Sequence, residues 1–272
     1  MGIIQYGEPL NVLVAVKGHP FQRDAFAAIF EDMDGVGATI VEQPAAAALM
    51  SPEGLALYDA LVLYDMPGLD FRASEPPGFV EPPEQLQWGL RAAMAQGKGV
   101  VALHHAIAGW PAWEGYGELL GGRFLYKPGS LKGRLHPDSG YRHDVTHTVR
   151  VVSDHPVTAG VPREFVLSDE LYLSEVFEDT VVPLLRSDYG FLKENFYSAH
   201  QAVNGKMFSN EGWNHAEGSS LVGWAKKAGG APLVYLQPGD GPATYADENY
   251  RRLIRNAVHW VASAEARDWA AE

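Results

Sequence analysis

Two adjacent histidines, His104 and His105, follow directly after the apolar run Val100–Leu103. Imidazole changes its charge near neutral pH, and its neutral nitrogens bind divalent metals, so this pair could move protons or hold an ion. The residues after them, Gly109-Trp110-Pro111, are typical of a turn. Because open α/β sheets bind ligands where their strands end, we expect the chemical centre of the chain at these histidines.

Two adjacent carboxylates, Asp169 and Glu170, precede Leu171-Tyr172 in a strand-like segment. Successive residues of a strand face opposite sides, so only one of the two can share a site with His104. We expect Glu170 to do so, as the partner that orients the imidazole, as a general base or as a metal ligand. Asp169 is expected to form a cap or a turn.

Aromatic and polar side chains in several other segments are predicted to gather at the same sheet edge. Aromatic faces suit the apolar faces of sugar rings, while amide, imidazole and carboxylate groups bind hydroxyls. The alternative for each aromatic residue is ordinary packing beneath long loops. The predicted substrate-binding residues are Trp110, Tyr172, Trp213, Asn214, His215 and Asp240.

Three further histidines, His136, His143 and His147, stand seven and four residues apart along the chain. This spacing fits no tight ligand pattern, and residues four apart on a strand are separated by about 13 Å. We therefore do not expect these three residues to bind one ion together. If a divalent metal such as zinc is bound, His104 and Glu170 are its predicted ligands.

The composition of the 272-residue chain excludes several classes of protein. It has no cysteine, which rules out disulfides, thiolate metal sites and a cysteine nucleophile. The formal net charge of −13, with no basic cluster larger than a pair, argues against nucleic acid or an anionic membrane as partner. No apolar run approaches the roughly 20 residues of a membrane span. Met1–Glu8 lacks a secretory pattern, so we expect a cytoplasmic location.

The hydrophobic pattern predicts alternating strands and helices first and mainly strands later. The first half contains predicted strands at 11–16, 38–42, 59–65 and 100–104 and helices at 21–33 and 84–96. The second half contains strands at 144–152 and 181–186, a strand-like segment at 165–172, a hairpin at 221–237 and a helix at 247–265. Residues 72–83 and 124–141 are predicted loops, and 189–215 receive no assignment. A single domain spanning 1–272, with a core at about 11–263, is predicted.

Several motifs occur in an order that resembles the ThuA-like (trehalose utilisation) family over residues 11–263. They are Val101-Ala-Leu-His104, Tyr116-Gly-Glu-Leu-Leu-Gly-Gly-Arg-Phe124, Asp154-His-Pro-Val-Thr158, Asp169-Glu-Leu-Tyr172, Val234-Tyr-Leu-Gln-Pro-Gly239 and Asn256-Ala-Val-His-Trp260. His104 matches a histidine of the family. The chain departs from many relatives at Gly239-Asp240, where they have Gly-His, and at Lys127-Pro128, where they have His-Pro.

The resemblance implies an α/β fold with a doubly wound, mainly parallel sheet and helices on both faces. This is the class I glutamine amidotransferase-like, or flavodoxin-like, architecture, with extra antiparallel strands in the C-terminal half. Amidotransferases of this fold carry a cysteine on the turn after a central strand. The corresponding turn here is Leu103–Ala106, and the chain has no cysteine, so glutamine hydrolysis by that route is excluded.

The resemblance also implies a role in carbohydrate catabolism, on a sugar or a keto-sugar. We expect acid/base or metal-assisted chemistry, as a hydrolase, isomerase or lyase, with His104, His105 and Glu170 as catalytic residues. A non-catalytic carbohydrate-binding or regulatory module on the same fold is the alternative. The expected partner is a small carbohydrate, and the sequence leaves a homo-oligomer open.

Overall fold

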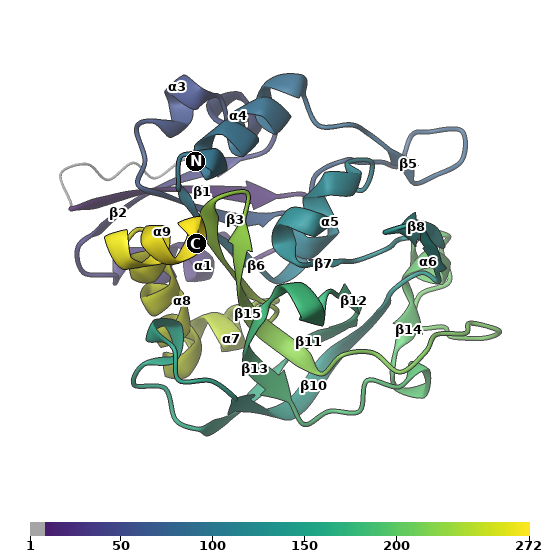
Figure 1. The fold of residues 1–272 in the computed structure, drawn as a ribbon. Coiled ribbons are helices and arrows are strands. Elements are labelled where there is room, and N and C mark those ends of the chain that lie inside the picture. The colour runs from purple at the N-terminus through teal and green to yellow at the C-terminus, as the bar shows by residue number, and fades with distance from the viewer. Residues whose placement is uncertain (1–8) are drawn as a thin grey trace.

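A computed structural model describes residues 9–272, so Met1–Glu8 and the expectation about a secretory signal lie outside the described residues. The main feature is a ten-stranded sheet that takes strands from both halves of the chain (Figure 1). Its strand order is β11-β10-β13-β15-β16-β6-β3-β1-β2, and the short β14 pairs with β10. The sheet thus joins the early β-α-β units to the later run of strands.

Five neighbouring strands form the parallel half of the sheet. Their apolar runs are buried on both faces: Val12 and Val14 face one side, and Leu13 and Ala15 face the other. The strands, in sheet order, are β2 (Val36–Glu42), β1 (Leu10–Lys17), β3 (Ala60–Asp65), β6 (Gly99–Leu103) and β16 (Ala231–Leu236).

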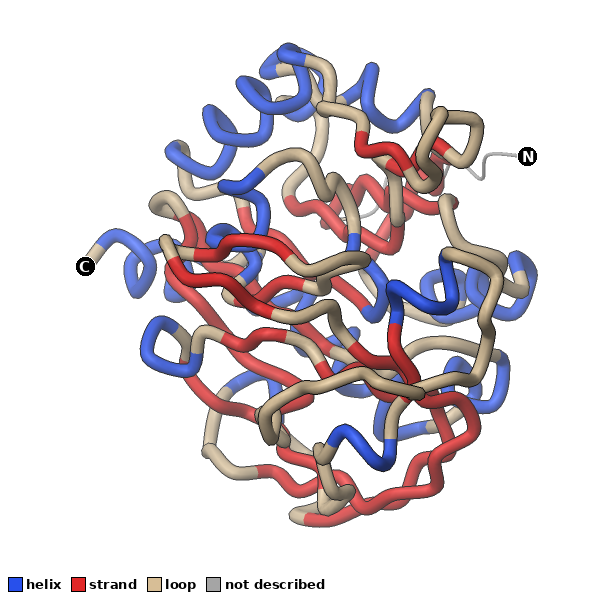
Figure 2. The backbone as a smooth tube through the Cα atoms, turned by 90° about the vertical axis from the view of Figure 1, so that its right-hand side faces the viewer, coloured by secondary structure: helices blue, strands red, loops and turns tan. Residues whose placement is uncertain are grey.

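Helices cover both faces of this parallel half, as Figure 2 shows. One face packs against α1 (Arg23–Glu31), α7 (Pro242–Ala246), α8 (Glu248–Val261) and α9 (Ala264–Ala271). The other packs against α2 (Ala45–Leu49), α3 (Pro52–Leu55), α4 (Glu84–Ala95) and α5 (Glu114–Leu120). Among residues 9–272, no helix combines the length and the apolar character needed to cross a bilayer.

Antiparallel strands extend the sheet on the other side of β16. The longest of them, β10, contains a bulge between Arg142 and Val145, where Asp144 takes a positive φ of 55°. The strands are β15 (Leu221–Ala228), β13 (Val182–Ser187), β10 (Gly140–Val151) and β11 (Glu164–Leu173), with β14 (Tyr197–Ser198) beside β10. Helix α6 (Ala199–Val203) follows β14 directly.

The remaining elements are short. Three two-stranded sheets consist of β4 (Leu69–Asp70) with β5 (Gly78–Phe79), β7 (Gly122–Arg123) with β12 (Glu175–Val176), and β8 (Gly129–Leu131) with β9 (Arg134–His136). The 3-10 helices are η1 (His104–Ala108), η2 (Pro156–Thr158), η3 (Glu178–Thr180) and η4 (Lys193–Asn195).

The architecture confirms the predicted α/β fold, including the antiparallel strands of the C-terminal half. Two local predictions were wrong. The loop predicted at 124–141 contains the hairpin β8–β9, because Lys132 and Gly133 both take the positive φ angles that a two-residue turn needs. The helix predicted at 247–265 ends at Val261, and the Ser263 hydroxyl caps α9 by accepting from the Ala266 amide.

Candidate functional site

His104 begins the 3-10 helix η1 at the carboxyl end of the central strand β6. Its backbone lies in the left-handed region with φ of 47°, which is uncommon for a residue with a side chain. Its fully buried ring is fixed because the Nδ1–H donates to the Gln237 carbonyl at 2.7 Å. Since Nδ1 is occupied in this way, Nε2 is left to face the neighbouring acidic groups.

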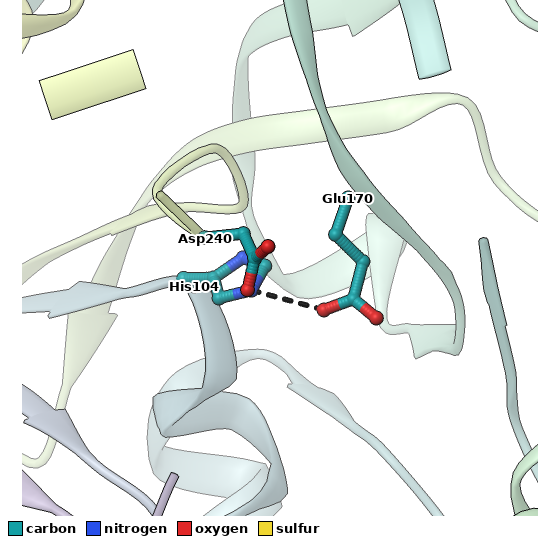
Figure 3. A group of neighbouring side chains, drawn as sticks. All are labelled: His104, Glu170 and Asp240. Carbon is teal, nitrogen blue, oxygen red and sulfur yellow. Dashed lines mark hydrogen bonds and ion pairs between the residues drawn. The ribbon is translucent and has the colours of Figure 1, made fainter. Parts of the chain in front are cut away.

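Three side chains surround the Nε2 atom of His104. Figure 3 shows His104, Glu170 and Asp240 converging from three separate segments. A Glu170 oxygen lies 3.2 Å from Nε2, an Asp240 oxygen lies 3.5 Å away, and the Tyr172 hydroxyl lies 2.9 Å away. The second Glu170 oxygen lies 3.2 Å from Nδ1 of His143 on β10. The Glu170 carboxylate therefore bridges two imidazoles.

The charge of His104 follows from this environment. Burial disfavours its cation, but the hydrogen bonds with Asp240 and Glu170 outweigh burial and raise its pKa from 6.5 to about 10. For Asp240, burial acts to raise the pKa, yet the contact with His104 brings it below its ordinary value. At neutral pH the buried His104 and the half-buried Asp240 therefore form an imidazolium beside a carboxylate.

Asp169 holds the segment that carries Asp240. One of its oxygens accepts from the Gly239 amide at 2.6 Å, and the other accepts from the Asp240 and Glu170 amides, each at 3.0 Å. Gly239 is required at this turn, because a Cβ atom would stand 2.4 Å from the Tyr250 hydroxyl and φ is 136°. Asp169 thus positions the two other carboxylates.

A cavity of about 160 Å³ opens beside Glu170. Its wall is largely apolar, and its polar or titratable side chains include His19, His143, Glu170 and Tyr172. His104 and Asp240 are not among the described residues that line this cavity. The groups able to touch a bound molecule are therefore Glu170 and its neighbours, with His104 directly behind the carboxylate.

His105 is fully buried and is not among the described residues that line this cavity. Its Nε2 atom is 3.2 Å from the Tyr64 carbonyl, and its ring packs 4.9 Å from that of His19. Burial and the nearby His104 lower its pKa well below the usual value, so the ring is neutral. Within residues 9–272 its Nδ1 atom has no hydrogen-bond partner.

Of the predicted substrate-binding residues, the structure brings Tyr172 and Asp240 to His104 and places the other four elsewhere. Trp110 lines a separate cavity of about 450 Å³ together with Pro67. The Trp110 amide donates to the Pro67 carbonyl at 2.7 Å, which holds this turn beside Pro67. Trp213 is buried, with its Nε1–H donating to the Asp138 carbonyl at 3.2 Å. His215 packs beside Trp213, and Asn214 points to solvent.

Two histidines at the cavity were not among the predicted site residues. His19 follows β1, and the rule that singled out His104 also applies to it, since it too follows the carboxyl end of a parallel strand. His143 gave no such signal, because it lies next to the bulge of β10, which periodicity does not reveal. His136 and His147 contact other partners, Glu175 and Ser187.

A divalent ion could be held by His104, Glu170 and Asp240. One ligand atom from each lies within 4.8 Å of the other two. An imidazole with two carboxylates is a donor set suited to zinc or manganese. The predicted ligand pair His104 and Glu170 thus gains Asp240 as a third member.

The comparisons with known proteins identify the family. The family model for trehalose utilisation, ThuA, matches residues 11–261. The chain is a member of the ThuA family. Its fold is similar to that of a ThuA-like protein from Parabacteroides merdae, with 15% identity, a TM-score of 0.63, and 94% of this chain and 91% of that chain covered. A ThuA-like protein from Bacteroides uniformis gives 18% identity, a TM-score of 0.60 and 94% coverage of both chains.

The ThuA fold extends to a wider group. PurLQS from Thermotoga maritima is 16% identical, with a TM-score of 0.53 and coverage of 93% of this chain and 99% of that chain. This ThuA-family chain therefore has the class I glutamine amidotransferase-like fold, without the cysteine on which amidotransferases depend. A search of the curated proteins finds no significant match.

Proposed function

We propose that this ThuA-family protein is an enzyme of carbohydrate catabolism that moves protons on a keto-sugar. The observation that carries this proposal is the Glu170 carboxylate, which faces a cavity while each of its oxygens contacts an imidazole. A carboxylate fixed in this way has one orientation and is able to act as a general base. The family description, trehalose utilisation, supports a sugar as the ligand.

The proposed reaction begins with a keto-sugar in the cavity, its acidic C–H bond directed at Glu170. Glu170 takes the proton from the carbon next to the carbonyl, and the C–H electron pair forms an enolate. His143, the more exposed of the two imidazoles, lines the same cavity and stabilises the developing oxyanion there. If the hydroxyl on the deprotonated carbon gives its proton to the former carbonyl oxygen and the former carbonyl carbon takes back the proton held by Glu170, the carbonyl moves by one carbon and the sugar is isomerised. If instead a β-substituent departs with its bonding electron pair, the enolate collapses to an eliminated, unsaturated keto-sugar.

The placement of the carboxylates argues against hydrolysis by a pair of acids. Glycosidases hold their two carboxyl groups on either side of the bond that is cleaved. Here oxygens of Glu170 and Asp240 meet at one buried nitrogen, and of the two residues only Glu170 is among the described residues that line the cavity. This arrangement favours proton transfer by Glu170 over attack from two sides.

Deuterium exchange tests the proposal directly. Incubation of a keto derivative of trehalose with the protein in D₂O should place deuterium on the carbon next to the carbonyl, as read by NMR. Binding without exchange or conversion would instead support the alternative of a non-catalytic carbohydrate module. Absence of binding by trehalose, glucose and their keto derivatives would overturn both proposals.

A second mechanism is favoured by one observation, the convergence of His104, Glu170 and Asp240 within 4.8 Å. If these residues bind a divalent ion, the ion would supply a Lewis acid at the cavity floor. Polarisation of the same keto-sugar is the chemistry such an ion would supply, and His19 and His143 would be the imidazoles that line the cavity. We also propose that the chain forms one domain and works in the cytoplasm.

A further inference from the structure

Phe208 has a conformation that packing does not explain. Its φ is 58°, in the left-handed region, which is unfavourable for a bulky aromatic residue. The usual compensation would be burial of the ring, yet 59% of Phe208 is exposed to solvent. A strained aromatic residue with more than half of its surface still exposed suggests a role for the ring itself.

The strained segment is attached to the cavity by specific contacts. The Phe208 amide donates to the Tyr141 hydroxyl at 3.0 Å, and Tyr141 lines the cavity. The preceding residue, Met207, also lines it. Phe208 is not itself among the described residues that line the cavity, but these contacts hold it directly beside two residues that are.

Phe208 is one of several aromatic rings in this region. Its centroid lies 5.6 Å from that of Tyr197, 6.4 Å from Tyr141 and 6.2 Å from His143. The Arg142 guanidinium lies 4.7 Å from the Tyr197 ring centroid and so helps to hold that ring. His143 connects this aromatic rim to Glu170, which it contacts at 3.2 Å.

The size of the cavity determines what the rim has to bind. At about 160 Å³, it is well below the roughly 300–1,000 Å³ of pockets that enclose a drug-sized ligand. It suits a single ring at most. A second ring of the same substrate would have to lie outside the cavity, and the exposed Phe208 lies beside two residues that line it.

We propose that Phe208, supported by Tyr197, is a stacking subsite for the second sugar ring of a disaccharide whose first ring is processed at Glu170. The inference rests on the proposed function and adds the substrate class to it. Aromatic faces bind the apolar face of a sugar ring through dispersion and desolvation, without needing a polar partner. Phe208 would thus determine the preference for disaccharides over monosaccharides.

The test compares the binding of trehalose and glucose by calorimetry, each also as its keto derivative. The variant Phe208→Ala should weaken the disaccharide about tenfold and leave the monosaccharide unchanged. Phe208→Tyr should retain the wild-type affinity. Trp88→Ala, which removes another exposed aromatic ring (62% exposed) on α4, should change neither affinity.

Phe208→Gly separates the role of the ring from that of the backbone. Glycine accepts the left-handed angle, so this variant should be at least as stable as the wild type and still lose disaccharide affinity. Equal weakening of both sugars by Phe208→Ala, or no weakening of the disaccharide, would overturn the subsite. If disaccharide binding depends on Phe208 but the protein catalyses no deuterium exchange, the subsite stands and only the proposed proton transfer is contradicted. Absence of sugar binding by the wild type would overturn both.

Discussion

The parallel and antiparallel halves of the sheet contribute to the site in different ways. The parallel half supplies His104 after β6 and Asp240 after β16, and neither lines the cavity within residues 9–272. The antiparallel half supplies His143 from β10 and Glu170 and Tyr172 from β11, and all three do. His104 and Asp240 thus form a supporting layer behind Glu170, although His19, which follows the parallel strand β1, lines the cavity itself.

The halves also differ in what the residue after the central strand faces. His104, in the turn after β6, takes a left-handed φ of 47°. Its Nε2 atom faces a carboxylate from another strand, and His104 is not among the described residues that line the cavity. The site chemistry in this ThuA-family protein would then be carried by the antiparallel strands.

The largest effect is expected from Glu170→Gln, which keeps the shape of the side chain and removes its basicity. Loss of the base should lower turnover of a keto-sugar, and its deuterium exchange, by about 10³–10⁴-fold. Glu164→Gln is the matched control, because Glu164 belongs to the same strand but is exposed and paired with Arg150. If the activity of Glu170→Gln is within a few-fold of that of the control, Glu170 is not the general base, and the assignment of the chemistry to the antiparallel half is wrong.

The next prediction compares one imidazole from each half. His143→Gln should lower kcat about 10³-fold, because it removes the group beside the developing charge. His104→Asn should lower kcat about 10²-fold with KM unchanged. The imidazole of His104 lies behind Glu170, and without it the Glu170 carboxylate loses its fixed orientation toward the cavity. Asparagine is chosen because it tolerates the left-handed angle of His104.

If His104→Asn lowered kcat more than His143→Gln, the parallel half would contribute more to the chemistry than the antiparallel half. Circular dichroism and thermal unfolding of both proteins provide the control for folding. A rise in KM for His104→Asn would also contradict the assignment, because a residue that only positions Glu170 should leave ground-state binding unchanged.

Sequence reasoning predicted the parallel half better than the antiparallel half. Continuous apolar runs such as Val100–Leu103 indicate buried parallel strands, and the strand-end rule located His104. It did not locate His143, because a bulge at Arg142/Val145 shifts the facing of that strand. It also predicted that Trp110 and Trp213 gather at the same sheet edge, whereas Trp110 lines a separate cavity and Trp213 is buried with its Nε1–H bonded to the Asp138 carbonyl.

The antiparallel half also contributes to acid stability, through the buried His147 of β10. Burial lowers the pKa of this ring from 6.5 to about 4, and its Nδ1 atom lies 2.8 Å from the Ser187 hydroxyl. Because the folded pKa is below the unfolded one, the folded state binds fewer protons, and stability falls as the pH drops from 6.5 to 4. The full loss is of the order of 3 kcal/mol.

His147→Asn should therefore reduce the dependence of the unfolding free energy on pH in this window. Asparagine can keep the contact with Ser187 and does not titrate. Urea unfolding at pH 7.0, 5.5 and 4.5 measures the effect, with the exposed His259→Asn on α8 as control. A wild-type slope in His147→Asn would show that His147 does not contribute to the acid sensitivity of the fold.

The smallest effect is expected from removing divalent ions. If His104 acts as an imidazolium that positions Glu170, dialysis against EDTA should leave keto-sugar turnover unchanged. Asp240→Asn should then have a weaker effect than His104→Asn, because Asp240 lies 3.5 Å from Nε2 and a Glu170 oxygen lies at 3.2 Å. A different result would give the parallel half a direct role through a bound ion. In that result EDTA abolishes the activity of the wild type, zinc or manganese restores it, and Asp240→Asn has no activity with or without the added metal.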